Sequence, residues 1–276
     1  MPTTQNHPLT KRLIQLINRA NFGRYASARF INEVAALLEI PAREGDSTAM
    51  YWLGMLNWDG WGTPQNRERA LQLLHVAAEA GNRKALFNLG VAYDNGFSVA
   101  ANRMKAFSYF MAAAKLGEAE AMHSVGDMLS TGEGIERNLC KAKYWYLKSA
   151  KRGFATAMYD IASCYQQGKG TKQNTRLAVQ WFERAVEQGE TKALTGLGYC
   201  YFKLVSPPNF VLARAYFEQA SELGHPNAIY NLGIMAENGH GQPQLLPDAV
   251  FWYRKAAELG HEGALLKLAS LTGETF

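Results

Sequence analysis

The feature that most constrains this chain of 276 residues is the regular return of one glycine. It stands at Gly45, Gly81, Gly117, Gly153, Gly189, Gly224 and Gly260, in steps of 36, 36, 36, 36, 35 and 36 residues. Four residues after each glycine stands an alanine, from Ala49 to Ala264. A chain with such internal similarity buries its apolar side chains by stacking copies of one small unit. The spacing therefore predicts one repeat array.

Each repeat contains two segments with helical spacing. In the first, the alanine is followed after four, five and eight residues by Leu, Gly and Tyr, as in Ala85, Leu89, Gly90 and Tyr93. These positions share one face of a helix. Because the small residue beside the leucine recurs, we interpret it as a site of close helix packing and not as a catalytic glycine. The second segment follows the pattern A-x-x-W-Y-x-K-A-A, as in Ala249 to Ala257, and Ala142 to Ala150 differs from it at Ser149.

An asparagine precedes the second segment in five repeats and predicts helix N-caps there. These residues are Asn66, Asn102, Asn138, Asn174 and Asn209. The sixth repeat has Leu245 at this place, followed by Pro247 and Asp248, so we expect a shifted helix start. The fifth repeat is one residue short and has FKLVSPPNF in place of a Gly-x-Gly turn. A harmless loop variant, a change of pitch and a partner contact all remain open for it.

Charge and cysteine content exclude several classes of protein. The net charge is +5, from 29 basic and 24 acidic residues spread along the chain, so we expect no nucleic-acid partner. The three cysteines cannot form a complete disulfide framework, and Cys164 and Cys200 fall on the core side of their helices. No apolar run approaches the roughly 18 residues that span a bilayer, and no secretory signal stands out. We therefore expect a cytoplasmic protein without membrane insertion.

The sequence offers no supported catalytic set. It lacks H-E-x-x-H and a pair of C-x-x-C motifs. The stretch from Gly168 to Lys172 fails the spacing of a phosphate-binding loop and follows a helix. We expect no enzyme activity, no cofactor and no metal site.

The repeat motifs resemble the Sel-one-like (Sel1-like) repeat family, a relative of the tetratricopeptide repeats, over about residues 45–276. The resemblance implies an all-α fold, an α/α solenoid wound as a right-handed superhelix of about six helical hairpins. Residues 1–44 would form a degenerate N-terminal cap, 45–259 six repeats, and 260–276 a capping half-repeat. The resemblance also implies a scaffold or adaptor for other proteins, with roles that include bacterial immunity proteins and chaperones for one cognate protein.

Positions 2, 6 and 9, counted from the alanine of the first helix as position 0, point away from positions 0, 4 and 8. By analogy with tetratricopeptide arrays they would line a concave face that binds a protein or peptide. The candidates are Tyr51, Met55, Trp58, Phe87, His123, Asp127, Tyr159, Tyr199, Phe202, Tyr230 and Ile234. Aromatic residues at position 2 also suit packing between repeats, and both interpretations stay open.

Two further alternatives concern function and assembly. A small-molecule-binding or catalytic protein with a site between repeats is the alternative to a protein scaffold. The last helix has no second helix to cover it, so Leu266 and Leu271 would form an apolar patch, a dimer contact or a folded-over end. We expect a monomer or a weak homodimer.

Overall fold

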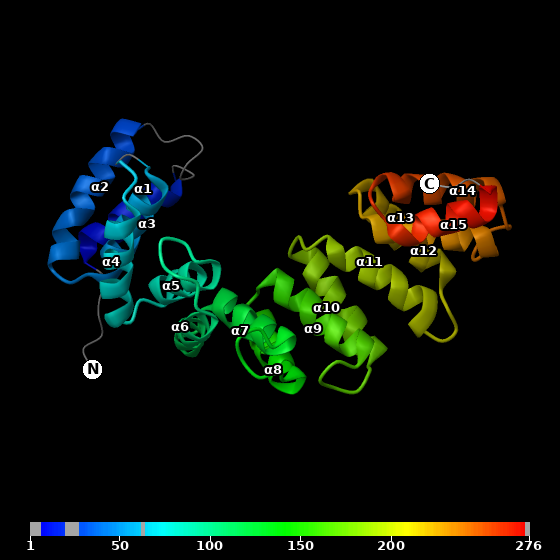
Figure 1. Cartoon of the computed structure of the whole chain (residues 1–276), viewed down its shortest axis with the longest axis horizontal. Helices are drawn as coiled ribbons and strands as arrows, with labels where there is room; N and C mark the ends of the chain where they lie inside the picture. Colours follow the sequence, from blue (N-terminus) through cyan, green and yellow to red (C-terminus); the bar gives the residue numbers. More distant parts are fainter. Residues whose placement is uncertain (1–6, 20–27, 62–63, 274–276) are drawn as a thin grey trace. The chain divides into compact units, whose positions relative to one another are not determined.

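The computed structural model describes residues 7–19, 28–61 and 64–273, and every regular element in them is helical (Figure 1). Parts of the two predicted caps, residues 1–6, 20–27 and 274–276, lie outside the described residues. The helices are α1 (Pro8–Arg19), α2 (Ala28–Arg43), α3 (Ser47–Asp59), α4 (Arg67–Glu79), α5 (Arg83–Asn95), α6 (Arg103–Lys115), α7 (Ala119–Thr131), α8 (Leu139–Ala150), α9 (Ala155–Gln167), α10 (Thr175–Glu187), α11 (Lys192–Tyr199), the π-helix η1 (Cys200–Leu204), α12 (Phe210–Glu222), α13 (Pro226–Asn238), α14 (Leu246–Glu258) and α15 (Glu262–Thr272).

These helices form two compact units, Met1–Arg137 and Asn138–Phe276. In the N-terminal unit, consecutive helices from α1 to α7 pack against each other. In the C-terminal unit the same holds from α8 to α15, and α11 also contacts α9 and α13. The first helices of successive repeats therefore lie side by side there. The predicted all-α array of helix pairs is confirmed.

Asparagine caps fix where the second helices begin. The side-chain oxygen of each of the five predicted asparagines accepts a hydrogen bond of 2.9–3.0 Å from the backbone N–H three residues later. These bonds satisfy N–H groups that a helix start leaves unpaired. The predicted N-caps are confirmed.

The sixth repeat begins its second helix in the same register as the others, so the expected shift was wrong. Leu245 is the N-cap of α14, with φ −136° and ψ 97°, close to the −147° and 95° of Asn138. Its backbone N–H donates to the carbonyl of Ala236, as that of Asn102 does to the carbonyl of Tyr93. Pro247 is tolerated because the first turn of a helix needs no N–H donor. Backbone hydrogen bonds set this start without a capping side chain.

The recurrent small residue is a packing position. A Cβ atom built on Gly90 would lie 2.6 Å from ring atoms of Phe110, and one on Gly198 would lie 2.5 Å from those of Phe217. At Gly233 the corresponding distance to the ring of Tyr253 is 2.5 Å. In each case the ring comes from the second helix of the same repeat. The interpretation of these glycines as packing residues is confirmed.

The fifth repeat is irregular because α11 continues into the π-helix η1. The N–H of Val205 closes this π-helix on the carbonyl of Cys200 at 2.9 Å. The ring of Tyr201 stacks on that of Tyr216 at 5.8 Å, as Tyr93 stacks on Tyr109 at 5.5 Å. The core-facing residues of this repeat therefore keep the usual spacing as far as Tyr201 at position 8. The repeat departs from that spacing after this residue.

The C-terminal helix α15 is attached through a small polar cluster. The Tyr253 hydroxyl donates to the Glu237 carboxylate at 2.5 Å, and the Lys267 ammonium lies 2.9 Å from each oxygen of that carboxylate. Glu237 belongs to α13, Tyr253 to α14 and Lys267 to α15. On the outer side of α15, Leu266 is 75% exposed, whereas Leu271 packs against the core. Of the two predicted end residues, Leu266 is the exposed one.

Candidate binding site

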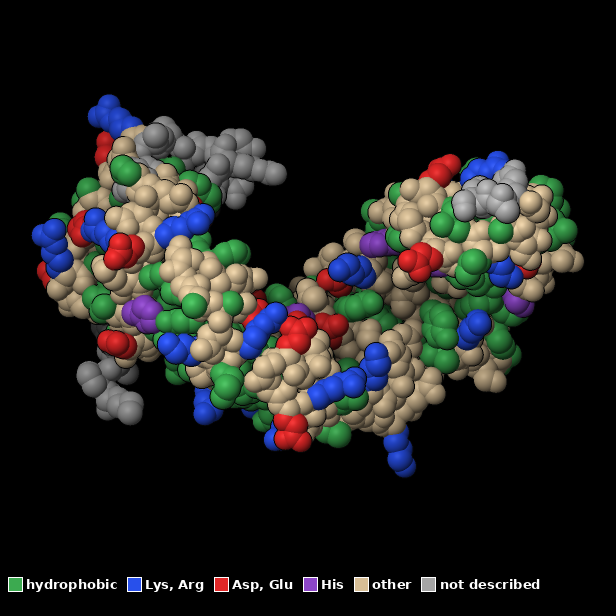
Figure 2. Space-filling model, in the orientation of Figure 1, with side chains coloured by type: hydrophobic (Ala, Val, Ile, Leu, Met, Phe, Trp, Pro, Cys, Tyr) green, Lys and Arg blue, Asp and Glu red, His purple; other side chains and the backbone are tan. Residues whose placement is uncertain are grey.

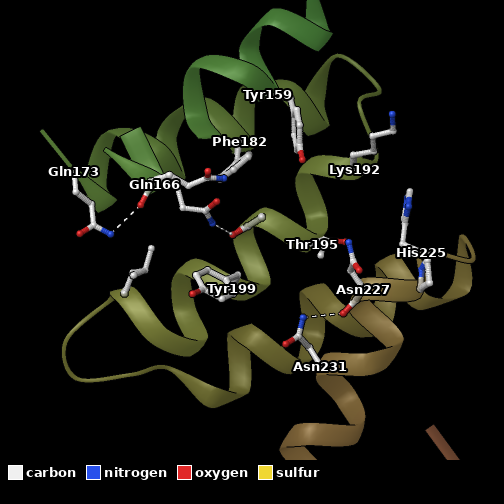
Figure 3. A pocket seen from close by; sticks show the side chains of 14 residues that line it. Tyr159, Gln166, Gln173, Phe182, Lys192, Thr195, Tyr199, His225, Asn227 and Asn231 are labelled. Carbon is white, nitrogen blue, oxygen red and sulfur yellow. Dashed lines mark hydrogen bonds between the residues drawn. The ribbon is translucent and has the colours of Figure 1, made fainter. Parts of the chain in front are cut away.

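The C-terminal unit contains a cavity of about 780 Å³ on the face formed by the first helices α9, α11 and α13 (Figure 3). Residues with polar side chains outnumber apolar ones in its lining. The lining residues are Tyr159, Gln166, Gln167, Gln173, Phe182, Lys192, Thr195, Gly196, Tyr199, Leu204, His225, Pro226, Asn227 and Asn231. We call this cavity the amide pocket, after its five carboxamide side chains.

The amide pocket has two different ends. Lys192 begins α11 and His225 is the N-cap of α13, so both stand where first helices start. Gln166 and Gln167 end α9, where first helices finish. Figure 3 accordingly shows Lys192 and His225 at one end of the pocket, and Gln166 with Gln173 at the other. The pocket is therefore basic at one end and neutral at the other.

The structure places Gly196 in the wall of the pocket at a position where other repeats carry a side chain. The equivalent residues are Trp52, Asn88, Ser124, Asp160, Asn231 and Lys267. A Cβ atom on Gly196 would lie 2.5 Å from Cζ of Phe182, so the end of that ring occupies the vacant space. The fourth repeat, from which Phe182 comes, has Ala162 where the other five have glycine. The absence of a side chain at Gly196 accommodates this ring, and both residues line the pocket.

Hydrogen bonds hold part of the pocket wall in place. Gln173 donates to the backbone carbonyl of Gln166 at 2.8 Å, and Asn231 donates to that of Asn227 at 2.7 Å. Gln166 donates to the carbonyl of Gly196 at 3.3 Å. Each of these amides donates through its NH₂ group, and the oxygen of a carboxamide is an acceptor. The pocket thus offers groups for a ligand on a partly fixed wall.

The charge at the basic end comes from Lys192. Among the described residues, no ion pair joins its ammonium group to a carboxylate. His225 lies with Nε2 at 3.1 Å from the hydroxyl of Thr191. On the opposite wall, burial raises the pKa of the Tyr159 hydroxyl, which therefore stays protonated and able to donate. Tyr199 is 39% exposed. A partner would meet donors and a positive charge here.

Of the eleven residues predicted to bind a partner, the amide pocket brings together Tyr159 and Tyr199. The aromatic residues at position 2 also serve packing, because each contacts the second helix of its own repeat. Ring centroids are 5.6 Å apart for Phe87 and Phe110, and 5.7 Å apart for Tyr159 and Phe182. Tyr230 lies 5.5 Å from Tyr253 and stacks on His261 at 4.2 Å. These side chains are half-buried, so they have a structural role whatever they bind.

The N-terminal unit has a smaller, apolar recess of about 110 Å³ that includes predicted residues. Met55, Trp58 and Val91 line it together with Phe97, whose ring meets Trp58 edge-on at 6.4 Å. The Asn88 amide donates to the sulfur of Met55 at 3.0 Å. Tyr51 is outside the recess wall; burial raises the pKa of its hydroxyl, and a hydrogen bond with Asn88 opposes that rise. This recess has room for one apolar side chain.

The remaining candidates do not line either cavity. On α7, Nδ1 of His123 lies 3.4 Å from the Asp127 carboxylate, four residues along the same helix. Such a pair supports the helix itself by a few tenths of a kcal/mol. Ile234 is half-buried and packs against the core on both sides of α13.

Phe202 is a correction to the predicted surface. The side chain is 4% exposed and its ring lies 5.2 Å from that of His240 and 5.9 Å from that of Phe210. His240 belongs to the turn of the next repeat, and Trp58 meets Phe97 of the next turn in the same way. At position 9, Phe202 and Trp58 therefore lie under the neighbouring turn, whereas Gln166 at the same position lines the amide pocket.

Helical geometry explains both this error and the pocket residues that the prediction missed. At about 100° per residue, inward positions 0, 4, 5 and 8 occupy an arc of about 0–140° around the helix. Position 9 lies at about 180°, beside that arc, whereas positions −1, 6 and 10 lie at about 260°, 240° and 280°, opposite it. Lys192 and Asn227 stand at position −1, and Gln167 stands at position 10. Counting back past the alanine would have found Lys192 and Asn227, and counting one residue beyond position 9 would have found Gln167.

Charged groups and cysteines agree with the expectations from composition. Figure 2 shows Lys and Arg interspersed with Asp and Glu on the visible face, without a basic stripe. Burial raises the pKa of the Cys164 and Cys200 thiols to about 11. Both thiols are therefore protonated at neutral pH, as expected of buried cysteines. None of the described helices combines the length and apolar character needed to cross a membrane.

Comparisons with known proteins agree with this architecture. The family model described as Sel1 repeat matches residues 47–82, 83–118, 119–154, 155–190, 191–225 and 226–261. A search of curated proteins found no significant match.

Solved structures show the same fold. The protective antigen c5321 of uropathogenic Escherichia coli, described as an SLR fold, has 25% identity and a TM-score of 0.83, over 95% of this chain and 56% of that one. This chain thus spans just over half the length of that protein. A Sel1 repeat protein from Oxalobacter formigenes has 27% identity and a TM-score of 0.73, over 91% and 97% of the two chains. The immunity protein PA5088 of Pseudomonas aeruginosa is similar in fold, with 18% identity and a TM-score of 0.52 over 81% and 84%.

Proposed function

Because this chain belongs to the Sel1 repeat family, whose fold typically mediates protein binding, we propose that it is a scaffold that binds one partner protein in the amide pocket. The partner would be a cognate protein that this chain neutralises or escorts. The amide pocket is the observation that carries the proposal, because it joins three successive first helices and presents polar groups to solvent.

The shape and chemistry of the pocket favour a protein partner. Tyr199 offers an aromatic ring of which 39% is exposed, and tyrosine is enriched among residues that dominate binding energies. Around it stand carboxamides that donate and accept hydrogen bonds, as the polar parts of protein interfaces do. These side chains stand on helices that are packed in pairs, so binding of a partner requires little additional ordering of the backbone.

Affinity capture from source cells tests the proposal. Tagged wild-type protein is compared with a Tyr199→Ala variant, and captured proteins are identified by mass spectrometry. We expect one protein that the wild type retains and that the variant loses by about tenfold or more, the loss typical of a central aromatic residue.

Tyr144→Ala is the matched control for this experiment. Tyr144 is 50% exposed, but it lies on the second helix α8, away from the amide pocket. Circular dichroism first establishes that both variants are folded. A partner retained equally by all three proteins would refute the amide pocket as the site, and the absence of any partner would argue against the scaffold itself.

A small-molecule ligand is the second candidate, and the cavity volume favours it. A cavity of about 780 Å³ falls within the range of about 300–1,000 Å³ usual for such sites. Thermal-shift measurements against a metabolite library separate the two candidates. A compound that raises the melting temperature of the wild type but not of Tyr199→Ala would support this second function.

Within the proposal the protein is not an enzyme. The residues that line the amide pocket include no carboxylate and no cysteine, and the two buried thiols near α9 and η1 are protonated at neutral pH. An acid–base pair or an activated nucleophile, which most catalytic sites need, therefore has no support in this cavity.

A further inference from the structure

We propose that the amide pocket binds an extended, acidic segment of the partner, with a carboxylate side chain at the Lys192 end and the main chain along the carboxamides. This inference rests on the proposed function and specifies the chemistry of the partner. It concerns the segment that enters the pocket and not the remainder of the partner.

The sign of the charge follows from the wall. Lys192 is the formally charged residue in the lining. The Glu190 carboxylate lies outside the lining, where it accepts from the backbone N–H of Lys192 at 3.4 Å and from the Thr156 hydroxyl at 3.3 Å. The Lys192 ammonium group makes no ion pair with the described carboxylates, so it is available to a partner. His225 and Asn227 stand at the same end and can donate hydrogen bonds (Figure 3). A carboxylate is stabilised here, and a lysine or arginine of the partner is repelled.

The extended conformation follows from the carboxamides. Each carboxamide has both a donor and an acceptor, which matches the alternating N–H and C=O groups of a main chain. An α-helix uses its main-chain groups internally and offers none of them to such a wall. An extended segment leaves them free. Gln166 and Gln173 on one side, with Asn227 and Asn231 on the other, therefore favour a segment without regular hydrogen bonding of its own.

The length of the segment follows from helix packing. The pocket reaches from α9 across α11 to α13. Packed helices lie about 8–10 Å apart, so two such steps span about 16–20 Å. An extended chain advances about 3.3 Å per residue, so about five or six residues cross the pocket. Gly196, on the middle helix α11, belongs to the lining along this path.

Selection from a random peptide library tests the inference without knowledge of the partner. A phage-displayed library of random dodecapeptides, fused so that no C-terminus is free, is selected on the full-length protein. We expect Asp and Glu to be enriched at least about twofold over the unselected library. A selected peptide, synthesised with an amidated C-terminus, should bind Lys192→Glu about tenfold more weakly by fluorescence anisotropy, as expected when one charge pair is lost.

Lys141→Glu is the matched control, since it makes the same charge change on α8, outside the pocket. It should bind the peptide as the wild type does. Lys192 begins α11, where a glutamate is compatible with the helix, so the variant should fold. Equal binding to wild type and Lys192→Glu, or selection of peptides without acidic enrichment, would overturn the inference. A selection that yields no binding peptide would overturn it too.

Failure of the acidic-segment inference can be distinguished from failure of the proposed function. A partner protein captured by the wild type and lost from Tyr199→Ala would keep the amide pocket as the binding site, even if no acidic peptide is selected. Loss of both results would remove the pocket as a site for proteins.

Discussion

Glu237 shows how much one side chain can contribute at the end of an array. Its carboxylate accepts from the Tyr253 hydroxyl and pairs with the Lys267 ammonium, so it joins α13, α14 and α15. Partial burial favours the neutral form of Glu237, but the hydrogen bonds from Tyr253 and Lys267 outweigh this and lower its pKa. The charged form is therefore the one that the folded protein stabilises.

We expect Glu237→Gln to lower the free energy of unfolding by about 1–2 kcal/mol at neutral pH, because it weakens hydrogen bonds to a charged group. The pKa of Glu237 is lower in the folded than in the unfolded protein. Its stabilising contribution is therefore present above the unfolded pKa and is lost as the pH falls through the folded value. Urea unfolding at pH 7 and at about pH 3 should show the difference between variant and wild type shrink in acid.

Glu258→Gln is the control, since Glu258 is an exposed residue of α14 for which no ion pair is recorded among the described residues. It should unfold as the wild type does at both pH values. An unchanged stability of Glu237→Gln at neutral pH would show that the cluster does not hold α15 in place.

At the residue scale, sequence reasoning succeeded where a single side chain determines a local structure. The asparagine caps are an example, because the side chain acts on N–H groups three residues away. The Glu237 cluster was not predicted, because it depends on side chains 16 and 30 residues apart on different helices. Helical spacing alone does not tell which polar residues of neighbouring helices meet.

At the scale of the helical element, α14 separates the contribution of the cap from that of the backbone. Leu245 has the extended backbone of the asparagine caps and the same backbone hydrogen bond, but it has no side chain that accepts from α14. The helix nevertheless begins in register. The cap residue therefore contributes stability at this place and does not decide where the helix begins.

We predict that Leu245→Asn stabilises the protein by about 1 kcal/mol, the usual value of an N-cap. The backbone already has the geometry of a cap, and the Leu245 side chain is 44% exposed, so little packing is lost. Thermal unfolding should show a higher midpoint than in the wild type, and Leu246→Asn should show no rise because residue 246 lies inside the helix. A fall in the midpoint of Leu245→Asn would mean that Leu245 packs more tightly than its exposure indicates.

The fifth repeat marks the limit of prediction for elements. The missing glycines and the residue lost from the spacing indicated an irregularity, and the structure shows it to be the π-helix η1. Neither Pro207 nor Pro208 reveals that the helix would widen at Cys200, where the ring of Phe202 packs against those of His240 and Phe217. The spacing of residues does not show which rings meet in this repeat, and the predicted exposure of Phe202 was wrong.

At the scale of the whole molecule, the repeated glycine contacts make stability a local property. Each repeat buries its apolar face against its neighbours, so a change in one repeat acts first on the helices beside it. Gly90 and Gly233 hold equivalent places in the N-terminal and C-terminal units, against Phe110 and Tyr253. Equivalent substitutions at these two glycines therefore test whether a loss of stability is confined to the helices near the substituted residue.

Gly90→Ala should lower stability by about 1 kcal/mol, because overpacking against Phe110 exceeds the gain in helix propensity. Hydrogen exchange should show faster exchange in α4 to α7 and unchanged protection in α12 to α14. Gly233→Ala should show the reverse pattern. An equal loss of protection in all helices after either substitution would contradict local stability and indicate one cooperative fold.

Phe182 and Gly196 link the inside of the C-terminal unit to its binding face. The end of the ring fills the place of a side chain that Gly196 lacks, and both residues line the amide pocket. A side chain added at residue 196 would have to displace the buried ring of Phe182. Partner preference and fold stability are thus epistatic here: in evolution, a new side chain at residue 196 would become acceptable only after a smaller residue had replaced Phe182 or Ala162.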